Sequence, residues 1–135
     1  MPSLNIEHFA CNVSDPVAMG AWYVKHLGMR ILRHLDAAPY THFLADAAGR
    51  VVVEIYANPD DPIPDYASMH PVRFHLAFAT DNPDDVRSAL VNAGATFVSE
   101  QTLADGSRLM MLRDPWGLAV QLCKRTTPLL PASHG

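Results

Sequence analysis

The second half of the chain opens on the apolar stretch RFHLAFA, residues 73–79, which carries one imidazole, that of His75. A short apolar run of this kind favours a buried β-strand. A similar stretch, IEHFACN at residues 6–12, opens the first half and carries His8. Eight residues after each histidine comes a proline, Pro16 or Pro83, where a helical pattern begins. The two stretches therefore suggest two copies of one structural unit.

The spacing of further residues supports a duplication. Three pairs of corresponding residues are each 67 positions apart: His8 and His75, Pro16 and Pro83, and Glu54 and Gln121. Two pairs of glycines keep nearly this offset, 66 positions for Gly28 and Gly94 and 68 for Gly49 and Gly117. An offset held within one residue along most of each half indicates an internal repeat.

The pattern predicts the order β-α-β-β-β in each half, and hence an α+β fold. In the first half we expect strands over 4–12, 29–35, 40–45 and 51–56, and in the second over 72–79, 96–99, 106–112 and 118–123. The first helix should run from Pro16 to Gly28 with Asp15 as N-cap, and the second from Pro83 to Gly94 with Asn82 as N-cap. The spacing predicts that the first helix buries an apolar stripe, which consists of Val17, Ala21, Val24 and Leu27.

A proline-rich segment divides the two halves. Residues 58–71 contain four prolines, which cannot continue a helix or a central strand. We therefore expect one domain over 1–135, made of a first module at 4–57, a linker at 58–71, a second module at 72–124 and a poorly ordered tail at 125–135.

Composition excludes several classes of function. The net charge is −4 and no basic stretch is interleaved with aromatic residues, which argues against a nucleic-acid partner. The chain has no apolar run of 18 residues and no leader-like start, so we expect a cytoplasmic protein without a membrane partner. Cys11 and Cys123 lack C-x-x-C spacing and are expected to be reduced and buried.

The repeat makes two pairs of polar residues equivalent, and these are the candidate metal ligands. His8 and His75 lie on the first strand of each module, and Glu54 and Gln121 lie on the last, each between apolar neighbours. Strand alternation places small alanines beside each histidine, which leaves room above that face. If the two curved half-sheets face each other, two imidazoles, a carboxylate and an amide oxygen converge. That set suits Zn²⁺, Ni²⁺, Co²⁺, Mn²⁺ or Fe²⁺. The alternative is that each histidine is a hydrogen-bonded core residue.

These features resemble the vicinal oxygen chelate superfamily, which includes glyoxalase I, bleomycin-binding proteins and extradiol dioxygenases. The resemblance covers about residues 4–124 and includes the HLG segment at 26–28 and DPWGLAVQL at 114–122. It implies a curved, mostly antiparallel, barrel-like sheet around a cavity, with metal ligands at His8, Glu54, His75 and Gln121. It also implies a small-molecule substrate or ligand and a homodimer.

Two departures from the family motif matter for function. Leu118 stands where the family has Asn, and Gln121 where it has Glu, so Glu54 is left as the candidate proton-transfer base. Two functions follow: a glyoxalase-like metal-dependent lyase, isomerase or dioxygenase acting on vicinal oxygens, or a metal-free binding protein of the bleomycin-resistance type. Further side chains could reach the cavity but are expected to be structural: His34, His42, Tyr56, Arg73, Arg108 and Met110. The remaining histidines, at 26, 70 and 134, are expected to be solvated.

Overall fold

The computed structural model describes residues 2–130, so residues 131–135, the end of the predicted tail with its histidine, lie outside the described part. The chain divides into two compact units, and the boundary falls between Pro64 and Asp65. This boundary lies inside the segment predicted as the linker.

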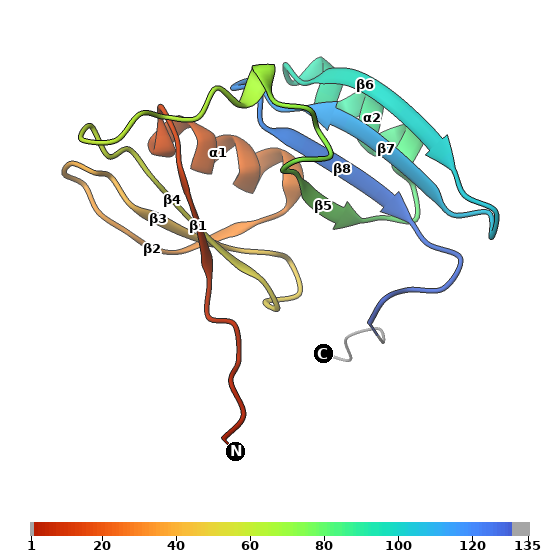
Figure 1. Ribbon diagram of the computed structural model, residues 1–135, viewed down its shortest axis with the longest axis horizontal. Coiled ribbons are helices and arrows are strands. Elements are labelled where there is room, and N and C mark those ends of the chain that lie inside the picture. Colours follow the sequence, from red (N-terminus) through yellow and green to blue (C-terminus); the bar gives the residue numbers. More distant parts are fainter. Residues whose placement is uncertain (1, 131–135) are drawn as a thin grey trace. The chain divides into compact units, whose positions relative to one another are not determined.

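The first unit is a four-stranded sheet with one long helix (Figure 1). Its elements are β1 (Phe9–Asn12), α1 (Pro16–Leu27), β2 (Arg30–His34), β3 (His42–Ala45) and β4 (Val52–Tyr56). The strand order is β1-β4-β3-β2. β1 and β4 are parallel, whereas the other neighbours are antiparallel. The helix contacts β2, β3 and β4.

The second unit repeats this arrangement after a short 3-10 helix. Its elements are η1 (Tyr66–Ser68), β5 (Leu76–Ala79), α2 (Pro83–Asn92), β6 (Thr96–Thr102), β7 (Arg108–Arg113) and β8 (Ala119–Lys124). The strand order is β5-β8-β7-β6, again with one parallel pair. The α+β class and the duplicated module are thus confirmed. The described strands form two separate mixed sheets rather than one closed barrel.

Strand register confirms the repeat residue by residue. Ala10 pairs with Glu54 in the first sheet, and Ala77 pairs with Gln121 in the second, so both partners are shifted by 67 positions. The register irregularity between residues 31 and 33 recurs between 97 and 99, an offset of 66. A bulge kept at the same place in both copies is a feature of the fold rather than a local defect.

The first strand of each module is shorter than predicted. β1 begins at Phe9, not at residue 4, and β5 begins at Leu76, not at residue 72. In the first sheet, the register that pairs Phe9 with Val53 places residues 4–7 beyond the start of β4. In the second, a turn occupies residues 71–73. Both predicted ligand histidines therefore lie immediately before their strands.

The helices begin at the predicted residues, but the buried face of α1 differs from the predicted one. The Asp15 side chain accepts a hydrogen bond from the Ala18 N–H, whereas Asn82 occupies the N-cap position without a side-chain cap bond. α2 ends at Asn92, earlier than predicted. Val17 and Val24 are exposed, which makes the predicted stripe wrong; the buried helix residues are Pro16, Met19, Gly20 and Tyr23.

Gly20 explains which face of α1 is buried. A Cβ at this position would lie 3.3 Å from the His42 ring and 3.8 Å from Leu44, so the absence of a side chain lets α1 approach β3 closely. His42 and Leu44 are both buried. Close packing of the helix on the sheet selects the glycine face, because a larger residue would hold the two elements apart.

Matching aspartate turns join the last two strands of each module. The Asp46 carboxylate accepts from the N–H groups of Arg50 and Val51, and the Asp114 carboxylate accepts from those of Trp116 and Leu118. Side-chain acceptors of this kind satisfy the backbone donors of a tight turn. Each turn precedes a strand that carries a predicted ligand, β4 with Glu54 or β8 with Gln121, and fixes where that strand begins.

Candidate functional site

The first unit brings His8 and Glu54 into direct contact. Nε2 of His8 lies 3.0 Å from Oε2 of Glu54, and the two side chains are 32% and 21% exposed. Side chains of paired residues share a sheet face, so Glu54 projects on the side of Ala10 and Phe43, its register partners. His42, one residue earlier on β3, faces α1. The histidine–glutamate pair therefore lies on the sheet face opposite the helix.

Both ring nitrogens of His8 face carboxylates. Nδ1 lies 3.0 Å from Oε1 of Glu7, and the ring meets Phe43 edge-on at a centroid separation of 5.5 Å. A neutral imidazole has a single N–H and can donate to one of the two carboxylates only. The second contact therefore needs an additional proton or a cation between the ring nitrogen and the carboxylate oxygen.

The second unit places His75 and Gln121 in the corresponding positions. Nδ1 of His75 donates to the Pro71 carbonyl at 2.9 Å, which fixes the tautomer and leaves Nε2 with a lone pair in the neutral ring. A backbone carbonyl that holds one ring nitrogen is the usual outer-shell partner of a metal-binding histidine. Oε1 of Gln121 accepts from the Cys123 thiol at 3.4 Å. Both His75 and Gln121 are half-buried.

Imidazole nitrogens and carboxylate or amide oxygens are ligands that the predicted metals accept. Within either unit, the described residues contain no group of three or more His, Cys, Asp or Glu side chains that could hold a metal ion. His8 and Glu54 form a pair, and His75 and Gln121 form its counterpart by register. The four-residue ligand set stays a prediction.

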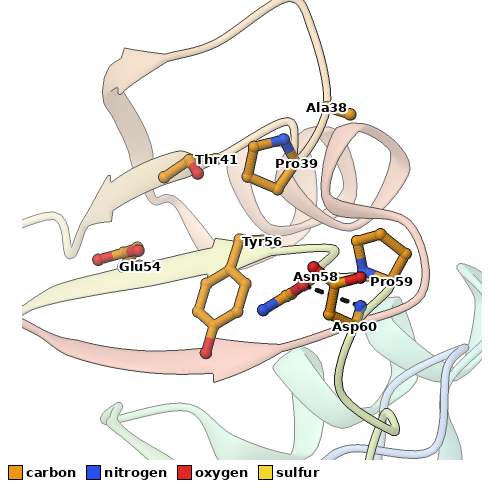
Figure 2. Close-up of a pocket in the computed structure, with 8 residues that line it drawn as sticks. All are labelled: Ala38, Pro39, Thr41, Glu54, Tyr56, Asn58, Pro59 and Asp60. Atoms are coloured by element: carbon orange, nitrogen blue, oxygen red, sulfur yellow. Dashed lines mark hydrogen bonds between the residues drawn. The ribbon is translucent and has the colours of Figure 1, made fainter.

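A pocket of about 460 Å³ lies beside Glu54 in the first unit (Figure 2). Its lining comes from β4, from the segment before β3 and from the loop after β4: Ala38, Pro39, Thr41, Glu54, Tyr56, Asn58, Pro59 and Asp60. A smaller hollow of about 220 Å³ adjoins His8 and includes Glu7, Arg33 and Phe43. The larger volume is in the range of cavities that take small organic ligands. Glu54 therefore both contacts His8 and lines a pocket large enough for a small ligand.

Most of the secondary candidates are structural. His42 is buried, and its Nδ1 donates to the Tyr40 carbonyl at 2.7 Å. Arg108 forms ion pairs with Asp84 and Glu100. Met110 is a core residue. Tyr56 is the exception, because it lines the larger pocket.

The cysteines are free and buried, as predicted. Burial raises the pKa of the Cys11 thiol from 9.0 to about 11, and burial also raises the pKa of Cys123. A thiol with a raised pKa carries little thiolate near neutral pH, so neither cysteine is suited to be a nucleophile.

Several pocket residues were missed by the sequence reasoning. Thr41, Asn58 and Asp60 line the larger pocket, and Glu7 is the partner of His8 Nδ1. Alternation along the predicted strand at 40–45 could have placed Thr41 with Phe43 on the open face. Asn58 and Asp60 follow β4 in an irregular loop, where the sequence offers no periodicity from which to infer direction.

Comparisons with known proteins agree with this architecture. The model of the Glyoxalase/Bleomycin resistance protein/Dioxygenase superfamily matches residues 5–122. The chain therefore belongs to this superfamily. A search of curated proteins finds no significant match. No helix in the described part of the chain is long and apolar enough to cross a membrane.

Solved structures from several bacteria share the fold. A glyoxalase family protein from Enterococcus faecalis is 26% identical, with a TM-score of 0.66 over 89% of this chain and 97% of that one. TnmS3, an antibiotic binding protein from Streptomyces sp. CB03234, is 20% identical, with a TM-score of 0.71 over 93% and 99%. A glyoxalase family protein from Bacillus cereus is 14% identical, with a TM-score of 0.74 over 92% and 95%. The last two show likeness of fold alone.

Proposed function

We propose that this protein is a metal-dependent enzyme that acts on a small substrate with vicinal oxygen atoms, by a lyase, isomerase or dioxygenase type of reaction. His8, Glu54 and His75 would hold a divalent cation, Zn²⁺, Ni²⁺, Co²⁺, Mn²⁺ or Fe²⁺, with Gln121 as a weaker fourth ligand. The proposal rests on membership of the superfamily and on the residues at these four positions.

The contact between His8 and Glu54 carries the proposal. Both side chains are partly exposed on the face opposite α1, so the pair is not needed to fill the core. An imidazole nitrogen and a carboxylate oxygen that converge at 3.0 Å form half of a typical site for a borderline divalent metal. The carbonyl of Pro71 orients His75 for the same role.

Glu54 is the residue that we assign to proton transfer. A bound divalent cation would supply a Lewis acid that polarises substrate oxygens. Glu54 borders the pocket, so its carboxylate could take a proton from a substrate carbon next to a carbonyl and return it to the neighbouring carbon. Gln121 cannot share this role, because an amide does not accept a proton near neutral pH. The chain thus offers one base in place of the family's paired carboxylates.

A metal-free binding protein is the second candidate function. Gln121 favours it, because an amide in place of a carboxylate weakens a metal site. The pocket beside Glu54 would then hold an organic ligand directly, with His8 and His75 as hydrogen-bonding groups. TnmS3 from Streptomyces sp. CB03234, which shares this fold, is an antibiotic binding protein.

Thermal unfolding in the presence of metals separates the two functions. Binding to the folded state raises the melting temperature, so Zn²⁺, Ni²⁺, Co²⁺, Mn²⁺ or Fe²⁺ should stabilise the wild type and a chelator should reverse the effect. His8→Ala and Glu54→Ala should abolish the shift. His34→Ala is the matched control, since His34 is half-exposed and pairs with Asp36 away from the pair. A melting temperature that no metal raises, but that an organic ligand does, would establish the binding protein instead.

A further inference from the structure

Different residues line the end of the larger pocket that is remote from Glu54. Figure 2 shows Glu54 at one end, Asn58, Pro59 and Asp60 at the other, and Tyr56 between them. The remote end is therefore built by the loop that follows β4. It would contact the part of a ligand that lies away from the proposed metal.

This loop is held in place by hydrogen bonds rather than left to adapt. The N–H of Asn58 donates to Asn12 Oδ1 at 2.9 Å, and Asn12 Nδ2 donates to the carbonyl of Asp61 at 3.2 Å. The Asn58 side chain in turn accepts from the N–H of Asp60 at 3.0 Å. Asn12 is buried and lies at the end of β1, so it ties the loop to the sheet. The Asp60 carboxylate is thus presented by a preformed turn.

A second contact fixes the opposite wall. The N–H of Ala57 donates to the Pro39 carbonyl at 2.9 Å, which links the chain after β4 to the loop between β2 and β3. Preformed walls lower the entropy cost of binding a ligand.

The charges that line the pocket are of one sign. Of its eight lining residues, Glu54 and Asp60 are acidic and none is Lys, Arg or His. If Glu54 is engaged with a metal, Asp60 remains as the anion of the pocket. The Tyr56 side chain lines the same pocket, with Asn58 between it and Asp60 in Figure 2, and its ring attracts cations through its electrons. A pocket lined by a carboxylate and an aromatic ring favours an organic ammonium group over a neutral or anionic one.

We infer that the ligand of this pocket carries a cationic amine, which binds at Asp60 and Tyr56, while its vicinal oxygens point toward Glu54. The inference rests on the proposed function for the position of the oxygens. The proposed function specifies the vicinal oxygens of the ligand only. The inference also specifies that the rest of the ligand is positively charged.

Three catechols that differ in the charge of their side chain test the inference. Dopamine is cationic, ethylcatechol neutral and dihydrocaffeate anionic, and all three carry vicinal oxygens. Their dissociation constants are measured by calorimetry without oxygen, on zinc-loaded and on chelator-treated protein. Dopamine should bind about threefold to tenfold more tightly than ethylcatechol, and dihydrocaffeate more weakly than both. High salt should reduce the difference in affinity between dopamine and the other two catechols.

Two pairs of variants test which residues cause the preference for dopamine over ethylcatechol. Asp60→Asn should bring the dopamine-to-ethylcatechol ratio close to one. Asp61→Asn, which removes the same charge one residue outside the pocket lining, should leave the ratio within about twofold of the wild type. Tyr56→Leu should reduce the ratio, whereas Tyr56→Phe, which keeps the ring, should not.

The outcomes separate the inference from the proposed function. If zinc strengthens binding of all three catechols but their affinities are equal, the inference is overturned and the metal site stands. If dopamine is preferred but zinc strengthens the binding of none of the three catechols, the inference stands and the metal-dependent function fails. Equal loss of preference in Asp60→Asn and Asp61→Asn, or no binding of dopamine to either form, would also overturn the inference.

Discussion

His8 and Glu54 meet at 3.0 Å, Nε2 to Oε2, on the sheet face that α1 does not cover. They are 46 residues apart in sequence and are joined by the parallel pairing of β1 with β4. The same pairing of β5 with β8 gives His75 and Gln121 the corresponding register. The repeat thus supplies two related pairs of polar side chains, one with a carboxylate and one with an amide.

Replacement of the amide should strengthen the proposed metal site. Gln121→Glu adds a negative charge and an anionic oxygen ligand, so we expect the affinity for Zn²⁺ to rise by about tenfold or more. Competition with a zinc-binding dye measures the change. Glu54→Gln is the mirror variant and should lower the affinity by a similar factor. If Gln121→Glu leaves the affinity as it was, position 121 is not a ligand.

The two turn glycines should differ in their tolerance of a side chain. Gly117 has a φ of 89°, and a Cβ there would lie 2.6 Å from the Cβ of Ala67, so Gly117→Ala should cost about 2–4 kcal/mol of unfolding free energy. Gly49→Ala is the matched variant in the first module. It has a φ of 70° but would meet only the flexible end of Arg30, so it should cost about 1 kcal/mol. Urea unfolding measures both, and equal losses would contradict this packing.

The two helix caps should also differ. Asp15→Ala removes the side-chain acceptor of the Ala18 N–H and should cost about 1 kcal/mol. Asn82→Ala removes a side chain that makes no cap bond in α2, so we expect a loss of a few tenths of a kcal/mol. Urea unfolding followed by circular dichroism distinguishes them. A larger effect at Asn82 than at Asp15 would be inconsistent with the observed caps.

The ion pair of Asp84 predicts a dependence on pH. Arg108 donates two hydrogen bonds to the Asp84 carboxylate and lowers its pKa below the ordinary value of 3.8. A folded pKa below the unfolded one stabilises the protein above 3.8, and this contribution disappears as the pH falls through the folded pKa. Asp84→Asn should therefore be less stable than the wild type near pH 7, and the difference should shrink in acid.

A neighbouring carboxylate provides the control for this prediction. Asp85 lies in the same first turn of α2, and Arg108 makes its ion pairs with Asp84 and Glu100. Asp85→Asn should therefore show a smaller pH-dependent difference than Asp84→Asn in urea unfolding at several pH values. Parallel curves for the two variants would argue against a role for the Asp84–Arg108 pair.

The order of elements could be predicted because local signals repeat along the chain. Prolines at the helix starts and glycines after the helices are local signals, and the 67-residue offset shows that the second half repeats them. The buried face of α1 could not be predicted from spacing. Apolar residues surround most of this helix, so several stripes satisfy a helical period, and the close approach of His42 to Gly20 selects the one that is buried.

The site was predictable at the residues that the repeat duplicates. The repeat relates His8 to His75 and Glu54 to Gln121, and the structure brings His8 and Glu54 together. The Glu7 contact and the Asp60 loop have no counterpart in the pattern, because their positions depend on turns and on the buried Asn12 side chain. Strand alternation does not extend into such segments.

The metal content of the purified protein decides whether the proposed metal site exists. Elemental analysis after exposure to Zn²⁺, Ni²⁺, Mn²⁺ and Fe²⁺ should find about one divalent ion per chain in the wild type and in the His34→Ala control. His75→Ala should lose most of it, since His75 is a proposed ligand whose ring is already oriented by Pro71. A wild type that stays free of metal under all four conditions would contradict the proposed metal site.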